Sequence, residues 1–173
     1  MWYVLQVRTG QETDIVAQCR KRLLCEGEDA FVMFGEKTRR LRGKWEMKRY
    51  PLFPGYVFFE TPDIDGFRVR LQEIRAMTKV LKTGDEVVPV WPEEEAFLKR
   101  LGGKEHIAGY SQGYIEGERL VVTEGAMKGF EGSIKRIDRH HRLVTIEAPL
   151  LGRIVEVQLG LGIVKRVEDE TEP

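Results

Sequence analysis

The stretch WYVLQVRTGQETDIVAQCRKRLL, residues 2–24, joins a strand pattern to a helix pattern. Its opening residues, WYVLQV, are mostly aromatic and aliphatic types that strands favour. Thr9 and Glu12 then have the spacing of a capping box, which predicts the start of a helix. Apolar residues recur at every fourth position along that helix: Ile15, Cys19 and Leu23. We therefore expect one face of the helix to pack on the strand.

Further patterns of the same kind continue to residue 102. The expected elements are strands over 30–36 and 55–60, and helices that start at Pro62 and Pro92. Residues 78–90 are expected to form a short strand, a turn at Gly84 and Asp85, and an extended return. The last helix begins with glutamates and ends with Lys99 and Arg100, which suits the helix dipole. The order β-α-β-β-α-β with a closing helix predicts the α+β class. We expect a ferredoxin-like split-βαβ sandwich over residues 1–102.

The chain changes character after this unit. Residues 103–113 are glycine-rich and show no clear period, which indicates a flexible linker. Residues 114–168 hold strand patterns separated by turn residues and no helix pattern: RLVVT, FEGSIKRI, LVTIEA, RIVEVQL and GIVKRV. They predict a small five-stranded β-barrel. The acidic tail, residues 169–173, is expected to be disordered.

Composition excludes several classes of protein. Lys plus Arg (28) equals Asp plus Glu (28), so any attraction for nucleic acid has to come from local patches. No segment approaches the roughly 20 apolar residues of a membrane helix, and no signal peptide is evident, so we expect a cytoplasmic monomer. Cys19 and Cys25 are interpreted as buried helix-face thiols. Motifs for catalysis, cofactors and metals are missing, which indicates a binding protein and not an enzyme.

Three segments follow one another along the chain: WYVLQV, PLFPGYVFFE (residues 51–60) and GERLVVTEGAMKGFEGSIKRI (residues 117–137). Together they resemble the hallmark segments of the NusG family of transcription elongation factors, over nearly the whole chain. The third segment is similar to a KOW motif, which several ribosomal proteins share. The resemblance implies an NGN-type RNA polymerase-binding domain at 1–102 and a KOW domain at 114–168.

The resemblance also implies a polymerase contact. In the family, an aromatic pocket built from the first strand and the FPGY segment caps the clamp helices of the beta-prime subunit. The matching residues in this chain are Trp2, Tyr3, Phe53, Pro54 and Tyr56. Ordinary core packing is the alternative for Trp2. Phe53 and Tyr56 are the expected contact residues, because rings of this kind supply the apolar centre of an interface.

Residues 37–50, KTRRLRGKWEMKRY, carry seven cations against one acid. Such a connection between strands suits phosphates, and Trp45 suits an unpaired base. The residues proposed to contact DNA near the transcription bubble are Arg39, Arg40, Arg42 and Lys44. The alternative is a solvated loop.

A second basic segment, KRIDRHHRL, lies between two expected barrel strands. Arginine forks and imidazole rings suit phosphates and unstacked bases, so we expect it to bind a hairpin in the nascent RNA. The residues proposed for this contact are Lys135, Arg136, Arg139, His140, His141, Arg142 and Arg153. A solvated basic turn is the alternative, and two adjacent turn histidines do not suffice for a metal site.

One departure from the family concerns the partners of the barrel. In common NusG proteins an aromatic before a GR pair contributes to binding the termination factor Rho or a small-subunit ribosomal protein. This chain has APLLGR, with Leu151 in place of the aromatic. With the basic turn, this suggests a specialised antitermination paralogue of the LoaP type. A ribosome-associated RNA-binding KOW protein is the alternative function.

Overall fold

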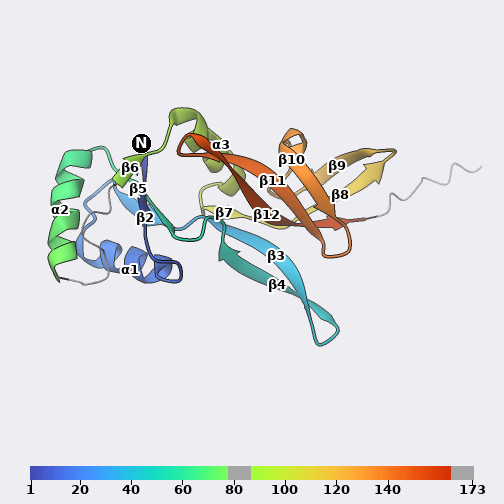
Figure 1. The fold of residues 1–173 in the computed structure, drawn as a ribbon, viewed down its shortest axis with the longest axis horizontal. Coiled ribbons are helices and arrows are strands. Elements are labelled where there is room, and N and C mark those ends of the chain that lie inside the picture. Colours follow the sequence, from blue (N-terminus) through green and yellow to red (C-terminus); the bar gives the residue numbers. More distant parts are fainter. Residues whose placement is uncertain (78–86, 165–173) are drawn as a thin grey trace, which may run out of the picture.

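The computed structural model describes residues 1–77 and 87–164 (Figure 1). The short strand and turn expected at the start of 78–90, the end of GIVKRV and the acidic tail lie outside the described residues. The N-terminal sheet has the order β2-β5-β1-β6, with every neighbouring pair antiparallel. Its strands are β1 (Trp2–Gln6), β2 (Asp29–Phe31), β5 (Tyr56–Glu60) and β6 (Val87–Pro89). This order confirms the ferredoxin-like sandwich, since the split βαβ motif places the third strand between the first two.

The two faces of this sheet bury different side chains because residues alternate along a strand. Tyr3 and Leu5 of β1 pack with helices α1 (Glu12–Arg22) and α2 (Ile64–Met77). Trp2 and Val4 face the other way, toward helix α3 (Pro92–Gly102). The second face is thus the one that leads to the rest of the chain.

Helix α1 starts differently from the prediction. Gln11 is its N-cap and makes no side-chain cap bond, so the expected capping box of Thr9 and Glu12 was wrong. The Glu12 side chain is buried and its carboxylate accepts N–H bonds from Gly10 at 2.9 Å and Gly55 at 2.7 Å. A buried carboxylate requires several hydrogen-bond partners. The amides of Gly10 and Gly55 supply them, so Glu12 does not form the expected capping box with Thr9.

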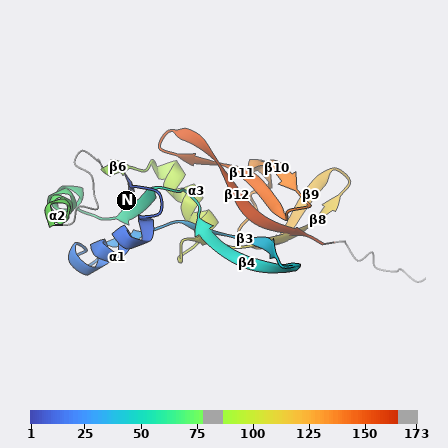
Figure 2. The ribbon, with the colours of Figure 1, turned by 60° about the horizontal axis from the view of Figure 1, so that its bottom comes forward.

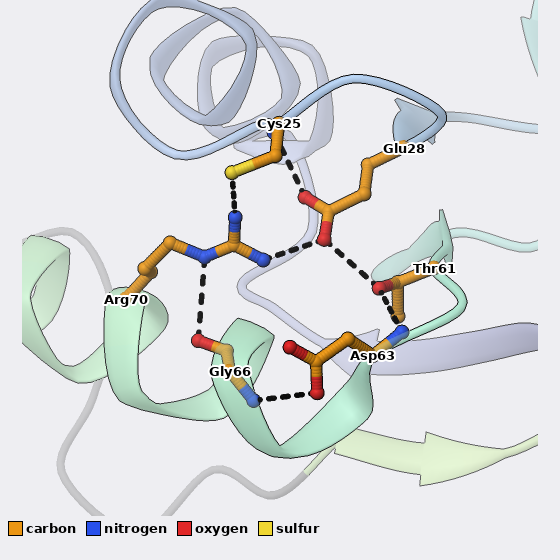
Figure 3. A network of polar contacts seen from close by, with 6 residues as sticks. All are labelled: Cys25, Glu28, Thr61, Asp63, Gly66 and Arg70. Atoms are coloured by element: carbon orange, nitrogen blue, oxygen red, sulfur yellow. Dashed lines mark hydrogen bonds and ion pairs between the residues drawn. The ribbon is translucent and has the colours of Figure 1, made fainter.

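The two cysteines have different environments. Cys19 is fully buried on α1, as predicted, and burial raises the pKa of its thiol to about 12. Cys25 is exposed, so the prediction that it is buried was wrong. It lies beyond the end of α1, where the loop to β2 turns toward α2, and its Sγ contacts Arg70 (Figure 3).

A polar network holds that loop against α2 (Figure 3). Glu28 accepts hydrogen bonds from the Cys25 amide at 2.9 Å and the Thr61 hydroxyl at 2.9 Å, and pairs with Arg70 at 2.5 Å. Burial opposes ionisation of Glu28, but these donors outweigh burial and lower its pKa. The network joins three separate segments without using any residue of the predicted interfaces.

The basic segment 37–50 forms a regular hairpin, named here the arm: β3 (Phe34–Leu41) and β4 (Lys44–Pro51). Arg42 and Gly43 make its turn with φ of 50° and 79°, as a two-residue hairpin turn requires. The strand expected over 30–36 is therefore divided between β2 and β3. The arm extends away from the N-terminal sheet in both views (Figures 1 and 2).

The C-terminal strands form a half-barrel of order β10-β11-β12-β8-β9, named here the barrel domain. They are β8 (Ser111–Glu116), β9 (Arg119–Glu124), β10 (Ile134–Asp138), β11 (Leu143–Leu150) and β12 (Arg153–Ile163). The fifth strand is β8, not the expected GIVKRV segment, because β12 continues to Ile163 and pairs there in parallel with β8. The segment predicted as a linker also holds β7 (Ile107–Ala108), which pairs with β3.

The barrel domain packs against the N-terminal domain, an arrangement named here the docked form. Helix α3 contacts β11, and β12 lies along β3 of the arm (Figures 1 and 2). One apolar cluster runs from Trp2 and Phe58 through Leu98 into barrel residues such as Ile146. The second face of the N-terminal sheet is covered in this way. None of the described helices is long and apolar enough to span a membrane.

Candidate functional site

The FPGY loop, residues 53–56, is fixed against the end of β1. Gly55 adopts φ of 84°, which favours glycine, and its carbonyl accepts the Val7 N–H at 2.7 Å. Its own N–H donates to the buried Glu12 carboxylate. A Cβ at Gly55 would lie 3.1 Å from the Val7 oxygen, so the close approach also favours glycine. The loop is therefore held in one position by backbone contacts.

The five residues predicted to bind polymerase do not share one surface. Trp2 and Phe53 are 1% and 2% exposed and belong to the cluster that continues into the barrel domain. Tyr3 lies on the opposite face of the sheet, buried under the helices. Pro54 is exposed and Tyr56 is half-buried. In the docked form, only Pro54 and Tyr56 offer much surface.

The barrel domain contacts this region directly. The Arg153 guanidinium donates to the Tyr56 hydroxyl at 2.5 Å. Arg153 was predicted to bind RNA, but here it belongs to the contact between the domains. The interaction places one barrel cation on the ring expected to meet polymerase.

Several residues of the domain contact were missed by sequence reasoning. Glu94, buried at the start of α3, accepts the Trp91 N–H and the Gly152 N–H, both at 3.0 Å. The Trp91 ring also lies close to Gly152, where a Cβ would be 3.1 Å from Cζ2. The helix-start pattern predicted a local role for Glu94 but carried no signal for its second bond across the domains.

A second set of contacts lies along β12. The Tyr50 hydroxyl donates to the Gln158 carbonyl oxygen, and burial raises the pKa of that phenol. Gly160 faces the arm so closely that a Cβ would lie 2.8 Å from the Glu36 oxygen and 2.9 Å from the Lys37 Cα. Glycine is what allows β12 to approach the β3 backbone.

The predicted arm residues lie at the exposed end of the hairpin: Arg39, Arg40, Arg42 and Lys44. Nearer its base, Arg49 pairs with Glu36 at 3.5 Å and Lys37 lies over the Tyr50 ring at 4.3 Å. Within residues 1–77 and 87–164, the four predicted cations have no ion pair. Their charge is thus available to an external anion.

The cations of the barrel domain divide into paired and unpaired groups. Lys135 and Arg136 both bind Glu156, the latter at 3.2 Å, and these bonds lower the pKa of Glu156. Arg139 and Arg142 form no ion pair with any described residue. The geometry therefore favours the turn over the neighbouring strand as an anion site.

The turn itself, residues 139–142, is ordered. The Asp138 carboxylate accepts the His141 backbone N–H at 3.0 Å and contacts His141 Nδ1 at 2.7 Å. The backbone bond, followed by the ring contact, lowers the pKa of Asp138. The His141 ring thereby binds within its own turn, whereas Arg139 and His140 are exposed and have no ion pair with a described residue.

The two basic segments meet in the docked form. The Arg142 guanidinium carbon lies 4.1 Å from the centroid of the Trp45 ring, so a barrel cation stacks on an arm aromatic. These segments are far apart in sequence, and each was predicted to act on its own. No group of His, Cys, Asp or Glu in the described part of the chain is arranged to hold a metal ion.

His106 links the α3–β7 connection to the core of the N-terminal domain. Its ring stacks on Phe31 with centroids 3.6 Å apart, and among the described residues its buried Nδ1 has no hydrogen-bond partner. Burial lowers the pKa of His106 below the ordinary 6.5. Because the unfolded chain then binds the proton more readily, stability is complete above the unfolded pKa and falls as the pH drops below it.

We expect the melting temperature to fall between about pH 7.5 and about pH 5.5, and to fall less in His106→Phe, which keeps a ring but cannot titrate. Thermal unfolding of both proteins at each pH measures the difference. His140 and His141 are present in both chains and cancel. An equal fall in the two proteins would show that protonation of His106 does not contribute.

The chain is similar to known proteins over most of its length. Residues 1–99 match the family model described as transcription termination factor nusG. The chain is 27% identical over 173 residues to the transcription termination/antitermination protein NusG of Haemophilus influenzae, covering 96% of this chain and 94% of that protein. It is 26% identical over 175 residues to the protein of the same name from Thermus thermophilus, covering 93% and 95%.

A solved structure concerned with domain interaction in NusG of Thermotoga maritima is similar in fold. The two share 23% sequence identity with a TM-score of 0.50, over 92% of each chain. At this identity the similarity supports the order of an NGN-type sandwich followed by a KOW half-barrel.

Proposed function

Because the chain belongs to the NusG family of transcription termination and antitermination factors, we propose that it binds the clamp helices of RNA polymerase through its N-terminal domain. It acts there as a binding factor in the cytoplasm and not as an enzyme. The FPGY loop carries this proposal. Glu12 and Val7 hold the loop in one position, with Pro54 and Tyr56 at the edge of a large apolar cluster.

The docked form bears on how this surface becomes available. Phe53 lies in a cluster that continues into the barrel domain, and the Tyr56 hydroxyl is occupied by Arg153. We propose that the barrel domain moves away before the clamp helices bind. A partner that binds only the open form has its apparent affinity reduced by the fraction of docked molecules.

The arm and the basic turn supply the nucleic-acid contacts of this proposal. The arm tip, with Arg39, Arg40, Arg42 and Lys44, reaches DNA near the transcription bubble. On the barrel domain, Arg139, His140 and Arg142 contact a nascent RNA hairpin, since they have no acidic partner among the described residues. Lys135 and Arg136 contribute less because Glu156 already neutralises them.

The turn at Leu151 and Gly152 matches the family segment that contributes to binding Rho or a ribosomal protein. In the docked form this turn lies against Trp91 and Glu94. Any such partner therefore requires the open form too. A specialised antitermination role of the LoaP type fits a barrel whose unpaired cations suit RNA.

Two substitutions of Tyr56 test the polymerase contact in the full chain. Tyr56→Ala removes the ring and is expected to weaken binding to a clamp-helix coiled coil by about 1–3 kcal/mol, as at a hot spot. Tyr56→Phe keeps the ring and removes only the hydroxyl that Arg153 contacts, so its binding is expected to stay equal or to strengthen. Isothermal titration with the coiled coil measures both.

The same titration separates the proposal from its rival. A ribosome-associated RNA-binding protein has no need of the FPGY surface and would leave the coiled coil unbound. Equal binding by folded Tyr56→Ala and by the unsubstituted chain would also contradict the assigned contact.

A further inference from the structure

We propose that the arm and the basic turn form a single RNA site in the docked form, in which Trp45 positions Arg142 to bind a phosphate. The inference rests on the proposed function, since it takes RNA as the ligand of the barrel domain. It adds that the barrel site is incomplete without the arm, and that RNA binding favours docking.

The orientation of Arg142 carries the first step. Its guanidinium lies over the Trp45 ring at 4.1 Å, while the five N–H donors of an arginine point outward in the guanidinium plane. Stacking therefore holds the group but leaves its donors available. A guanidinium ordered before binding loses less entropy when it binds a phosphate. Two of its N–H groups can donate to two phosphate oxygens at once.

The charges around this stack point to an anion. Arg40 lies directly opposite Trp45 in the hairpin register, so the two side chains are cross-strand neighbours. Two acids lie in the same elements: Asp138 binds His141, and Glu46 lies opposite Arg39 in the hairpin register. Cations from two domains are thus brought together, and neither Arg40 nor Arg142 has an ion pair with a described residue. A polyanion that spans both elements offsets their repulsion.

A pocket beside Arg142 indicates what part of the RNA enters. It has a volume of about 1050 Å³, and Arg139 and Arg142 lie on its wall with Tyr110, Ile115 and Ile163. Glu116 also lines it, so the wall carries one acid. Apolar and aromatic side chains beside arginines suit an unstacked base with its phosphate, as in loops and single strands.

This arrangement couples RNA to polymerase. Trp45 belongs to the N-terminal domain and Arg142 to the barrel domain, so the stack exists only in the docked form. A ligand that binds the docked form better shifts the chain toward it, and by linkage opposes any partner of the open form. RNA and clamp helices are therefore expected to compete without sharing a surface.

A double-mutant cycle tests whether Trp45 acts through Arg142. The probe is a fluorescein-labelled RNA hairpin with an unpaired uridine loop, titrated into the full chain at several salt concentrations. Arg142→Ala should weaken binding by about 10-fold or more and flatten the log affinity against log salt slope by roughly 0.7 to 0.9. Trp45→Ala should weaken binding by about 2- to 30-fold, the range of a cation–π contact.

The double variant decides between positioning and direct contact. If Trp45 only positions Arg142, Trp45→Ala with Arg142→Ala binds no more weakly than Arg142→Ala alone. Trp45→Phe should recover most of the loss. Met47→Ala, which trims another exposed side chain of β4, is the matched control and should bind like the parent. Losses that simply multiply in the double variant would overturn the positioning role.

Further measurements distinguish this inference from the proposed function. A fully paired duplex of the same stem should bind more weakly than the hairpin and respond little to Arg142→Ala. Adding clamp-helix coiled coil should lower the affinity of the parent chain for the hairpin. Loss in Arg142→Ala with parental binding in Trp45→Ala keeps the barrel as an RNA binder and overturns the composite site. No binding by the parent chain overturns both.

Discussion

Gly160→Ala is expected to separate the two domains and to strengthen binding of clamp helices by about 5- to 150-fold. The added Cβ would lie 2.8 Å from the Glu36 oxygen and 2.9 Å from the Lys37 Cα, both of them backbone atoms of β3. Such overpacking costs about 1–3 kcal/mol when the neighbours cannot move. That cost falls on the docked form, because β3 is not a neighbour of β12 once the barrel domain leaves. The open form gains by the same factor.

Two measurements check this expectation. Small-angle scattering should show a larger radius of gyration in Gly160→Ala, and titration with the clamp-helix coiled coil should show the tighter binding. The hairpin RNA should bind more weakly to the same variant, because undocking separates Trp45 from Arg142.

Controls are available in the same domain. The added Cβ of Gly160→Ala also meets the Tyr110 ring at 2.4 Å, so the effect of moving that ring has to be removed. The three heavy atoms nearest to an added Cβ at Gly162 all belong to the Tyr110 side chain, and a Cβ at Gly132 meets nothing within 4 Å. Gly162→Ala and Gly132→Ala should both stay docked. If Gly162→Ala opens the chain as much as Gly160→Ala does, the approach of β12 to β3 is not what holds the domains together.

Local patterns predicted most of the N-terminal domain correctly. The alternation of side chains in β1 and the fourth-residue spacing in α1 each report a buried face, and together they specify a sandwich. The capping box at Thr9 failed because Glu12 has a better partner in Gly55, which is distant in sequence. A local rule has no access to such a competitor.

In the candidate sites too, local patterns predicted some features and missed those that depend on residues distant in sequence. The sequence alone indicated that the arm and the turn are rich in cations. Which of these cations are neutralised depends on the register of the sheet. Glu156 of β12 reaches Lys135 and Arg136 across the sheet, and no spacing in the sequence indicates that pairing. The stack of Arg142 on Trp45 was equally hidden, because it depends on how two domains pack.

Docking gives the glycine and aromatic residues of this chain two kinds of role. Gly55 is required by a turn within one domain, whereas a Cβ at Gly160 would meet both the backbone of the other domain and the Tyr110 ring. Similarly, the half-buried Tyr56 is proposed to contact a partner, whereas Trp2 is buried in the apolar cluster under the sheet. Substitutions that affect polymerase binding therefore have to be separated into those that change the surface and those that change the fold.

Phe53→Ala is expected to affect the fold and not only the surface. It should lower the free energy of unfolding by about 3–5 kcal/mol. The ring is 2% exposed, lies 6.0 Å from the Phe58 ring and sits in the cluster shared by both domains. Removing it leaves a cavity that the loop cannot fill, because Gly55 is held by Glu12 and Val7. A loss of this size is a large fraction of a typical domain's stability.

Urea denaturation of Phe53→Ala, Phe53→Leu and Tyr56→Ala measures the ranking. Phe53→Leu keeps most of the volume and should lose much less stability than Phe53→Ala. Tyr56→Ala, at a half-buried position, should also lose less while losing more of its clamp-helix affinity than Phe53→Leu. If Phe53→Ala instead keeps its unfolding free energy and loses only polymerase binding, Phe53 contacts the clamp helices directly. The ring would then belong to the interface, as the sequence first indicated, and not to the core beneath it.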